Sequence, residues 1–323
     1  MGTGTGAAMV GDDEMRRVAD SADVGRGLVD GAARRIGALE CGPIGFGCWR
    51  FTDADPGRSA ALLEAAIEAW MTLVDNADVY GLDWGGSGWG TCEENLGAAL
   101  AHRPTLRDRI VLATKGGIVP GVPYVSDPAY LVAACEASLR RLGVDHVDLY
   151  QIHRPDPFTH PAAVAHAFES LRERGLVREF GVSNHTPSQT AALQAHLPFP
   201  LASTQPELSV VALQPLRDGT LDQSAALGIT PLAWSPLAGG RLATGDGVRP
   251  ELVDVLDRLA EREGVTRAAV AIAFVLAHPS RPVAIVGTQQ PARLAELAVA
   301  ATVHLDRRDV YDLIVASDGV PLP

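Results

Sequence analysis

The chain has 323 residues, of which 47% are hydrophobic, and its formal net charge at pH 7 is −12. This length suits one large domain or two smaller ones, and the acidic balance argues against nucleic acid or an anionic membrane as a partner. No apolar run reaches about 18 residues, which argues against a transmembrane helix. No signal peptide is visible either, so we expect a cytoplasmic protein.

The cysteines give no indication of a metal centre or a disulfide framework. They show neither C-x-x-C spacing nor a Cys/His ligand pattern. We therefore expect four reduced thiols and no metal site, at Cys41, Cys48, Cys92 and Cys135.

Residues 1–38 are rich in Gly, Ala and Asp without sustained periodicity, which predicts a flexible extension with room for one short helix. Beyond them, short apolar or β-branched runs alternate with Ala- and Leu-rich helical patterns. The predicted strands span 43–48, 72–75, 109–114, 147–152, 177–182, 200–204, 230–234 and 282–286. The predicted helices lie near 58–70, 91–102, 127–142, 161–174, 187–195, 217–227, 250–277 with a break at Gly264, 291–301 and 306–316.

A regular alternation of eight strands and eight helices, with one more helix after the last unit, is typical of a (β/α)8 TIM barrel. The competing fold is a doubly wound open sheet, but no Gly-rich dinucleotide turn follows the first strand. We therefore expect a single-domain barrel over residues 39–323. In such barrels the chemistry collects at the carboxyl ends of the strands.

The chain contains a single lysine, Lys115, and every other basic side chain is arginine. Lys115 ends the buried run RIVLATKG, where an unpaired ammonium would be costly and where lysine, unlike arginine, shifts its pKa readily. There are two alternative explanations. The ammonium could simply reach solvent, or the lysine could have been retained by chance in an arginine-rich sequence. At the end of a barrel strand, however, an ionisable group favours a functional role.

Every strand from the second to the eighth delivers a polar, ionisable or aromatic group to the same rim. Each of these residues taken alone also has a structural explanation, such as a turn cap or a satisfied core histidine. Their concentration at one end is hard to explain by folding alone. They are Asp75, Tyr80, Lys115, His153, Ser183, Asn184, Gln205, Trp234, Ser235, Gly287, Thr288 and Arg293.

Asp75, Tyr80, Lys115 and His153 could form one proton-transfer unit. A phenol has a pKa near 10, and a nearby ammonium should lower it toward the neutral range. A carboxylate would keep that ammonium charged and oriented. An imidazole could polarise a carbonyl by donating a hydrogen bond to it. This set suits the reduction of a carbonyl group.

Seven segments closely resemble those that define the aldo-keto reductases, and they occur in the order found in that family. They are TLVDNADVYG (72–81), VLATKGG (111–117), DLYQIHRPD (148–156), EFGVSNH (179–185), STQPELS (203–209), AWSPLAGGRL (233–242) and IVGTQQPARLAEL (285–297). The HRPDP and AWSPLAGGRL stretches look like a bacterial branch. The resemblance implies a catalytic tetrad of Asp75, Tyr80, Lys115 and His153, with Tyr80 as general acid, and NADPH bound without a Rossmann fold.

The same resemblance implies how the cofactor would be held. Ser183, Asn184 and Gln205 would bind the nicotinamide carboxamide, because they supply matched donors and acceptors. Trp234 would stack on the nicotinamide ring. The loop after it would approach the pyrophosphate, through Ser235, Leu237, Gly239 and Arg241.

At the adenosine end, Thr288, Arg293 and Glu296 match the family pattern. Gly287 stands where many NADPH-specific members carry a lysine, and Leu297 replaces an asparagine. Because Arg293 can still fork onto a 2′-phosphate, we expect NADPH to be preferred, with NADH possible.

The substrate is expected to be a small carbonyl compound, and four aromatic residues and one arginine on the rim are the candidates for contacting it. These are Trp49, Arg50, Trp84, Trp89 and Tyr124. Two other functions stay open: a Schiff-base aldolase using Lys115 as nucleophile, and a non-catalytic nucleotide-binding module. The oligomeric state is expected to be a monomer or a small homo-oligomer.

Overall fold

Eight parallel strands close into a barrel in the computed structural model, which describes residues 25–322. The order around the barrel is β10-β3-β4-β5-β6-β7-β8-β9. The barrel strands are β3 (Ile44–Gly47), β4 (Leu73–Asp75), β5 (Val111–Gly116), β6 (Val147–Ile152), β7 (Val177–Ser183), β8 (Ser203–Gln205), β9 (Thr230–Ala233) and β10 (Val283–Val286). The predicted TIM barrel is confirmed.

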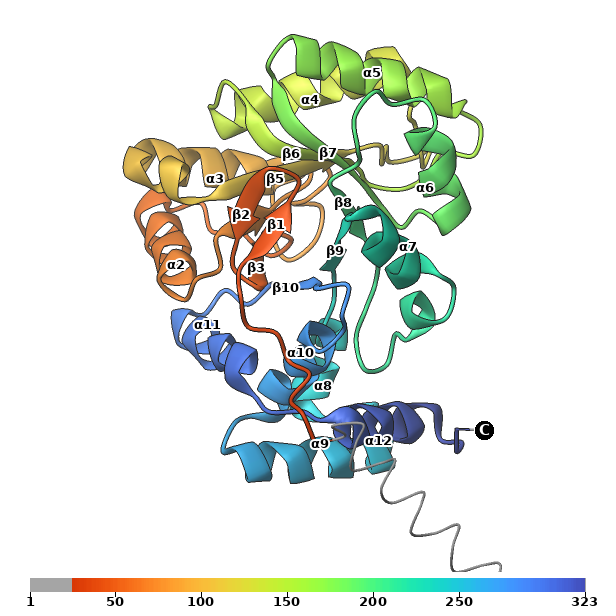
Figure 1. The fold of residues 1–323 in the computed structure, drawn as a ribbon. Coiled ribbons are helices and arrows are strands. Elements are labelled where there is room, and N and C mark those ends of the chain that lie inside the picture. Colours follow the sequence, from red (N-terminus) through yellow and green to blue (C-terminus); the bar gives the residue numbers. More distant parts are fainter. Residues whose placement is uncertain (1–24, 323) are drawn as a thin grey trace, which may run out of the picture.

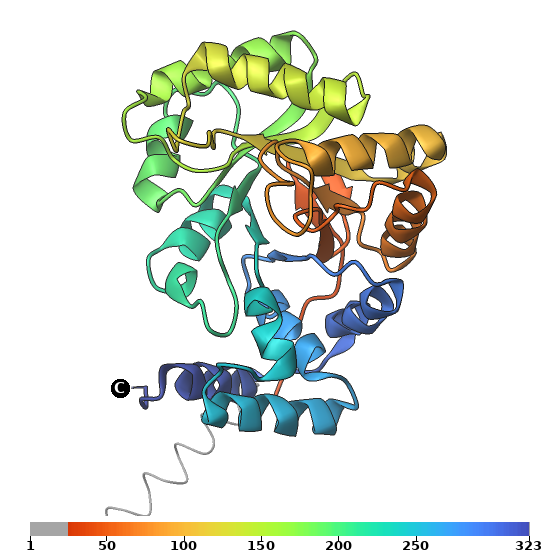
Figure 2. The same ribbon diagram turned by 180° about the vertical axis from the view of Figure 1, so that it is seen from behind.

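Helices surround the barrel on the outside (Figures 1 and 2). They are α2 (Pro56–Glu68), α3 (Thr91–His102), α4 (Pro128–Leu142), α5 (Pro161–Glu173), α6 (Pro187–Gln194), α7 (Thr220–Leu227), α8 (Arg241–Thr244), α9 (Pro250–Glu263), α10 (Arg267–Leu276), α11 (Pro291–Ala298) and α12 (Arg307–Asp318). Short 3₁₀ turns are η1 (Pro104–Arg109), η2 (Gln214–Leu216), η3 (Ala238–Gly240) and η4 (Val299–Thr302).

Local sequence signals explain where several helices begin and end. The carboxylate of Asp127 accepts hydrogen bonds from the backbone N–H groups of Ala129 and Tyr130, and it thereby caps α4 just before Pro128. The expected break at Gly264 is also confirmed. That glycine ends α9 in the left-handed conformation, with φ 66°, and Thr266 caps the start of α10.

Two predicted strands are shifted along the chain. The prediction of 109–114 is wrong by two residues because Pro104–Arg109 form the turn η1, so β5 begins at Val111 and contains Lys115. The strand predicted at 200–204 runs from Ser203 to Gln205. In both cases the shift carries the strand further toward the rim that holds the polar side chains.

The predicted extension over residues 1–38 has to be corrected at its C-terminal side. Residues 1–24, with the short helix considered there, lie outside the described part. Arg34–Ile36 form β1, which pairs antiparallel with β2 (Leu39–Cys41). Ile36 is fully buried against the starts of the barrel strands, and Arg34 donates from its guanidinium to the carbonyl oxygen of Pro282 at 3.1 Å. The boundary expected at residue 38 therefore falls inside a hairpin that covers the barrel.

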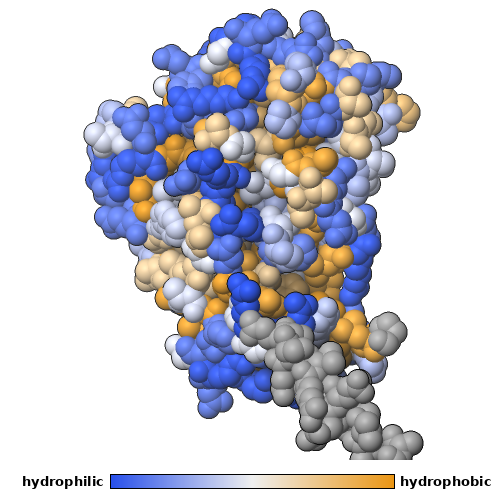
Figure 3. Space-filling view, in the orientation of Figure 1, coloured by the Kyte–Doolittle hydropathy of each residue, from blue (hydrophilic) through white to orange (hydrophobic). Residues whose placement is uncertain are grey.

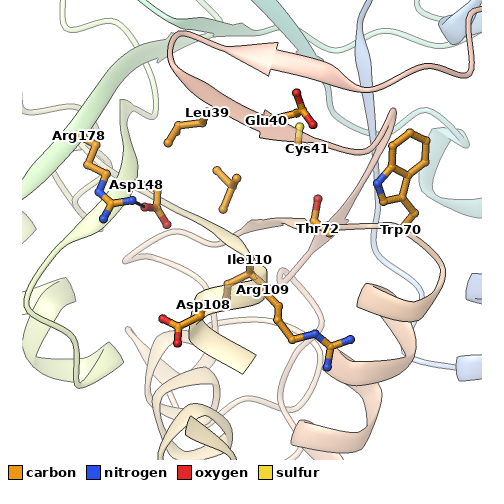
Figure 4. A pocket seen from close by; sticks show the side chains of 11 residues that line it. Leu39, Glu40, Cys41, Trp70, Thr72, Asp108, Arg109, Ile110, Asp148 and Arg178 are labelled. Carbon is orange, nitrogen blue, oxygen red and sulfur yellow. Dashed lines mark hydrogen bonds and ion pairs between the residues drawn. The ribbon is translucent and has the colours of Figure 1, made fainter. Parts of the chain in front are cut away.

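The hairpin covers the amino-terminal ends of the strands, and it lies in front of the barrel in Figure 1. Figure 3, in the same orientation, shows hydrophilic and hydrophobic residues interspersed over this face. A cavity of about 340 Å³ lies beside the hairpin, and Figure 4 shows Trp70 and Asp148 on opposite sides of it. Because Thr72 and Val111 at the strand starts also line it, this cavity is at the opposite end from the predicted catalytic residues. No helix among residues 25–322 is long and apolar enough to span a bilayer.

Candidate active site

The four residues predicted to form a tetrad meet at the carboxyl ends of β4, β5 and β6. The Nζ of Lys115 lies 2.7 Å from the Asp75 Oδ2, 2.8 Å from the carbonyl oxygen of Asn76 and 3.4 Å from the Tyr80 Oη. The ring of Tyr80 meets the ring of His153 edge to face, with 5.6 Å between the centroids. Three successive strand ends thus bring an acid, a phenol, an ammonium and an imidazole into one cluster.

The charges of this cluster are nearly removed from solvent, since Lys115 is 0% exposed and Asp75 is 3% exposed. Burial lowers the pKa of Lys115, but the charges of Asp75 and Tyr80 and their hydrogen bonds outweigh it, so the net shift is upward. Burial raises the pKa of Tyr80, and the opposing effect of Lys115 does not cancel it. The predicted net lowering of the phenol pKa is therefore wrong for this arrangement, because desolvation and the nearby Asp75 carboxylate exceed the attraction of the ammonium.

His153 follows β6 directly and is buried, with its Nδ1 lacking a hydrogen-bond partner among the described residues. Burial, together with the charges of Lys115 and Arg154, holds the pKa of His153 well below 6.5. The imidazole is therefore neutral at physiological pH. A neutral imidazole beside the phenol can donate one hydrogen bond to a substrate oxygen while leaving the role of acid to Tyr80.

A second layer of amides supports Asp75, and one member of it was missed by the sequence reading. The Nε2 atoms of Gln205 and Gln151 lie 3.1 Å and 3.5 Å from the Asp75 Oδ1. The Oε1 of Gln151 in turn accepts from the hydroxyl of Ser203 at 3.1 Å. The signal for Gln151 was available, because a glutamine inside an otherwise buried strand requires polar partners.

The residues expected to hold a carboxamide form a connected network beside the tetrad. The hydroxyl of Ser183 donates to the carbonyl oxygen of Gln205 at 3.0 Å, and the Nδ2 of Asn184 lies 2.8 Å from the Ser183 Oγ. Asn184 also donates to the carbonyl oxygen of His153 at 3.2 Å. The indole N–H of Trp234 donates to the Asn184 Oδ1 at 3.0 Å. The ends of β7, β8 and β9 thus bring these residues together beside the tetrad, where Asn184 contacts His153 and the side chain of Gln205 contacts Asp75.

Three of the four residues assigned to the pyrophosphate loop lie on the turn between β9 and α8, and the fourth begins α8. The hydroxyl oxygen of Ser235 accepts from the backbone N–H of Gly239 at 3.2 Å. Leu237 is half-buried, whereas Gly239 is exposed and has φ 73°. Arg241 is exposed, and apart from a bond to the carbonyl oxygen of Ala238 its guanidinium has no partner among the described residues.

The residues assigned to the adenosine end follow β10, the neighbour of β9 in the barrel. Gly287 and Thr288 lie in the loop and are half-buried, and Thr288 accepts from the backbone N–H of Gln290 at 3.3 Å. Arg293 and Glu296 are exposed on α11. Neither forms an ion pair with a described residue, so both are available to a ligand.

Of the five residues predicted to contact substrate, the structure joins three. The rings of Trp49 and Trp84 pack edge to face with 5.6 Å between centroids, and the guanidinium of Arg50 lies 3.9 Å from the centroid of the Trp84 ring. Trp89 is half-buried near the start of α3. Tyr124 is joined instead to Ile118 by a short antiparallel bridge in the loop after β5.

A buried carboxyl behind the tetrad was not singled out from the sequence. Both oxygens of Asp78 are buried without a hydrogen-bond partner among the described residues, and so is the hydroxyl of Tyr130. Burial, with the charge of Glu93, raises the pKa of Asp78 to about 8. Burial and the charge of Asp78 raise the pKa of Tyr130 to about 12. Asp78 lies two residues before Tyr80, so this acid sits at the base of the loop that carries the phenol.

Comparison with known proteins is consistent with this geometry. The model of the aldo/keto reductase family matches residues 43–315. A 6-dehydroglucose reductase of Novosphingobium aromaticivorans is 45% identical over 297 residues, which cover 90% of this chain and 97% of the relative. Oxidoreductase YdhF of Escherichia coli K12 is 38% identical over 288 residues, covering 86% and 94% of the two chains.

Among solved structures, the thermostable aldo-keto reductase Tm1743 in complex with the inhibitor epalrestat aligns with a TM-score of 0.76 and 25% identity. The alignment covers 88% of this chain and 99% of that one. Both the family model and the relatives named as reductases therefore span most of the barrel. On these grounds the chain belongs to the aldo/keto reductase family of oxidoreductases.

Proposed function

We propose that this protein is an NADPH-dependent reductase of aldehydes or ketones in which Tyr80 donates the proton. The observation that carries the proposal is the position of the Tyr80 Oη, 3.4 Å from the ammonium of the single lysine, which is itself held 2.7 Å from Asp75. Membership of the family supports carbonyl reduction in general. The assignment of roles to individual residues is ours.

The side chains around the tetrad fit a nicotinamide cofactor. Ser183, Asn184 and Gln205 bring hydroxyl and amide groups close to His153 and Asp75, which is the chemistry that a carboxamide needs. Two exposed guanidinium groups, those of Arg241 and Arg293, lie on the helices α8 and α11, which follow the neighbouring strands β9 and β10, in a chain of net charge −12. When bound, the cofactor supplies the hydride.

The protein's own side chains would donate the proton and stabilise the charge that develops during the reaction. As negative charge develops on the substrate oxygen, Tyr80 transfers its proton to that oxygen and is left as a phenolate. Lys115 then stabilises the phenolate, and Asp75 keeps Lys115 charged. His153, which is neutral, donates a hydrogen bond that orients the carbonyl. Because its pKa is raised, the Tyr80 phenol stays protonated until the proton is transferred to the substrate oxygen.

The name of the relative from Novosphingobium aromaticivorans suggests a substrate class. A 6-dehydroglucose is a glucose oxidised at carbon 6, so it carries an aldehyde on a neutral polyhydroxylated ring. In this chain the exposed indoles of Trp49 and Trp84 offer apolar surfaces with a polar N–H edge, and Trp84 lies on the loop after β4 that also carries Tyr80. We therefore propose a sugar aldehyde of this kind as the substrate, with NADPH preferred over NADH because Arg293 is available for the 2′-phosphate.

The Schiff-base alternative is disfavoured by the same geometry. A nucleophilic lysine must be neutral, but the buried carboxylate of Asp75 contacts Lys115 and the pKa of Lys115 is raised. An aldolase would also leave the amide network beside His153 without a role.

The decisive experiment compares the wild type with Tyr80→Phe, using 6-dehydroglucose and NADPH. We expect Tyr80→Phe to lower turnover by at least about a thousandfold while the NADPH dissociation constant changes little, since the phenol acts in proton transfer. Full turnover by Tyr80→Phe would remove Tyr80 as the acid. A wild type that binds neither NADPH nor NADH would overturn the reductase proposal. Turnover of simple aldehydes without turnover of the sugar would leave the reductase standing and reject the sugar.

A further inference from the structure

Arg50 contacts both the aromatic rim and the loop assigned to the pyrophosphate. It follows β3 and stacks its guanidinium on the Trp84 ring, 3.9 Å from the centroid. Its Nη2 lies 3.4 Å from the carbonyl oxygen of Gly239. A single side chain therefore connects the loop after β4 with the loop after β9.

Trp84 is a residue that such support would stabilise. Its side chain is 51% exposed, and its backbone adopts φ 58°, a conformation that is unfavourable for a bulky residue. The loop around it is rich in glycine. Besides the Arg50 stack, its ring meets the ring of Trp49 edge to face, and its carbonyl oxygen accepts from the hydroxyl of Thr52 at 3.0 Å.

Gly239, which accepts the hydrogen bond from Arg50, lies on a loop that could move when a ligand binds. Gly239 is exposed, has φ 73°, and a Cβ placed there would meet no atom within 4 Å. The bond from Arg50 to its carbonyl oxygen is long, so a small movement of this loop would strengthen or break it. The guanidinium would then shift on Trp84.

We propose that Arg50 is a positioning residue that couples occupation of the β9–α8 loop by cofactor to the placement of Trp84 on the substrate rim. This inference rests on the proposed function. Arginine suits the task because its planar guanidinium can stack on an indole with its face while its edge donates a hydrogen bond. A lysine ammonium has no planar face with which to stack on the indole. Through this coupling, bound cofactor would hold Trp84 in the position in which it contacts substrate.

The test is hydrogen–deuterium exchange of the peptide covering residues 81–91, with and without NADPH, in the wild type, Arg50→Lys and Thr52→Val. Thr52→Val is the matched control, since it removes the other polar contact of Trp84 without touching Gly239. We expect NADPH to slow exchange of this peptide in the wild type and in Thr52→Val. In Arg50→Lys, NADPH should bind but leave the exchange unchanged.

Steady-state kinetics give a second measure. Arg50→Lys should raise the KM for the carbonyl substrate by about two- to fivefold, as expected for weakening one stacking contact at an exposed site, with kcat nearly unchanged from the wild type. Retained NADPH-dependent protection of residues 81–91 in Arg50→Lys would overturn the inference. So would equal loss of protection in Thr52→Val, which would indicate general loosening of the loop. Because the exchange experiment needs only NADPH binding, failure of the coupling is distinguishable from failure of the reductase proposal, in which the wild type binds no cofactor.

Discussion

The ammonium of Lys115 lies 2.7 Å from the carboxylate of Asp75 at a point where both side chains are buried. A buried charge is tolerable only when it is paired and hydrogen-bonded. Here Asp75 also accepts from the amides of Gln151 and Gln205, and Lys115 donates to the carbonyl oxygen of Asn76. The pair is therefore one structural unit, and removing either partner isolates the other charge.

Lys115→Met should destabilise the protein and abolish turnover. The substitution leaves Asp75 buried without its counter-ion, which costs about 3–5 kcal/mol of unfolding free energy in comparable pairs. Urea unfolding would measure the cost. The double variant Asp75→Asn, Lys115→Met should recover part of the lost stability because no charge is left unpaired, yet it should remain inactive. A double variant no more stable than Lys115→Met would show that the pair is not coupled.

The two ring groups of the tetrad should cause no change in the rate of carbonyl reduction around neutral pH. The pKa of His153 lies well below 6.5 and that of Tyr80 is raised above 10.0. From about pH 6.5 to 9, neither residue should change its proton occupancy. We expect kcat measured over this range to show no inflection near pH 6.5. An inflection there that disappears in His153→Gln would mean that the imidazole titrates during turnover.

Much of the candidate site could be predicted because its signals are local in the chain. Alternating strands and helices indicated a barrel, and the residue after each strand indicated which side chains share a rim. Lys115 stood out because it is the single lysine. The structure brings Asp75, Tyr80, Lys115 and His153 together, as expected.

What could not be predicted depends on contacts between distant segments. The pairing of β1 with β2 was missed because each strand has only three residues, although Ile36 and Leu39 flank a turn at Gly37. The sign of the Tyr80 pKa shift depends on how completely the phenol is desolvated, which no sequence pattern reports. The link from Arg50 to Gly239 joins residues 189 positions apart.

Cofactor preference should respond to two residues that follow β10, Gly287 in the loop and Arg293 on α11. Arg293 is exposed and has no ion pair with a described residue, so Arg293→Ala should weaken NADPH binding by about tenfold or more and leave NADH binding nearly unchanged. Arg308→Ala, another exposed arginine without a described ion pair, controls for the loss of one charge. Equal weakening of NADPH binding by both variants would contradict a specific role for Arg293.

Gly287→Lys should act in the opposite direction. A Cβ at Gly287 would meet only the carbonyl oxygen of Gly47, at 3.8 Å, so the side chain has room. The added ammonium should tighten NADPH relative to NADH by several-fold through the 2′-phosphate. Titration of both nucleotides would measure the ratio of dissociation constants. An unchanged ratio would mean that the 2′-phosphate does not lie near this position.

Asp78 should make stability fall as the pH rises. Its pKa in the folded protein is about 8, above the ordinary value of 3.8, because the carboxyl is buried near Glu93 and both its oxygens lack described partners. The native protein therefore holds this proton more tightly than the unfolded chain does. The resulting stabilisation is complete below about pH 4 and is lost progressively as the pH approaches and passes about 8.

Asp78→Asn removes this dependence, because an amide of nearly the same shape carries no charge at any of these pH values. When the pH rises from 5 to 9, the wild type should lose more unfolding free energy than Asp78→Asn does. The difference should be on the order of a few kcal/mol. Urea unfolding at both pH values would measure it. Asp254→Asn, which replaces an exposed carboxylate on α9 without a described ion pair, should follow the wild type at both. If Asp78→Asn and the wild type lost the same stability over this range, Asp78 would be ionised in the folded protein throughout, and an unseen partner would have to satisfy its oxygens.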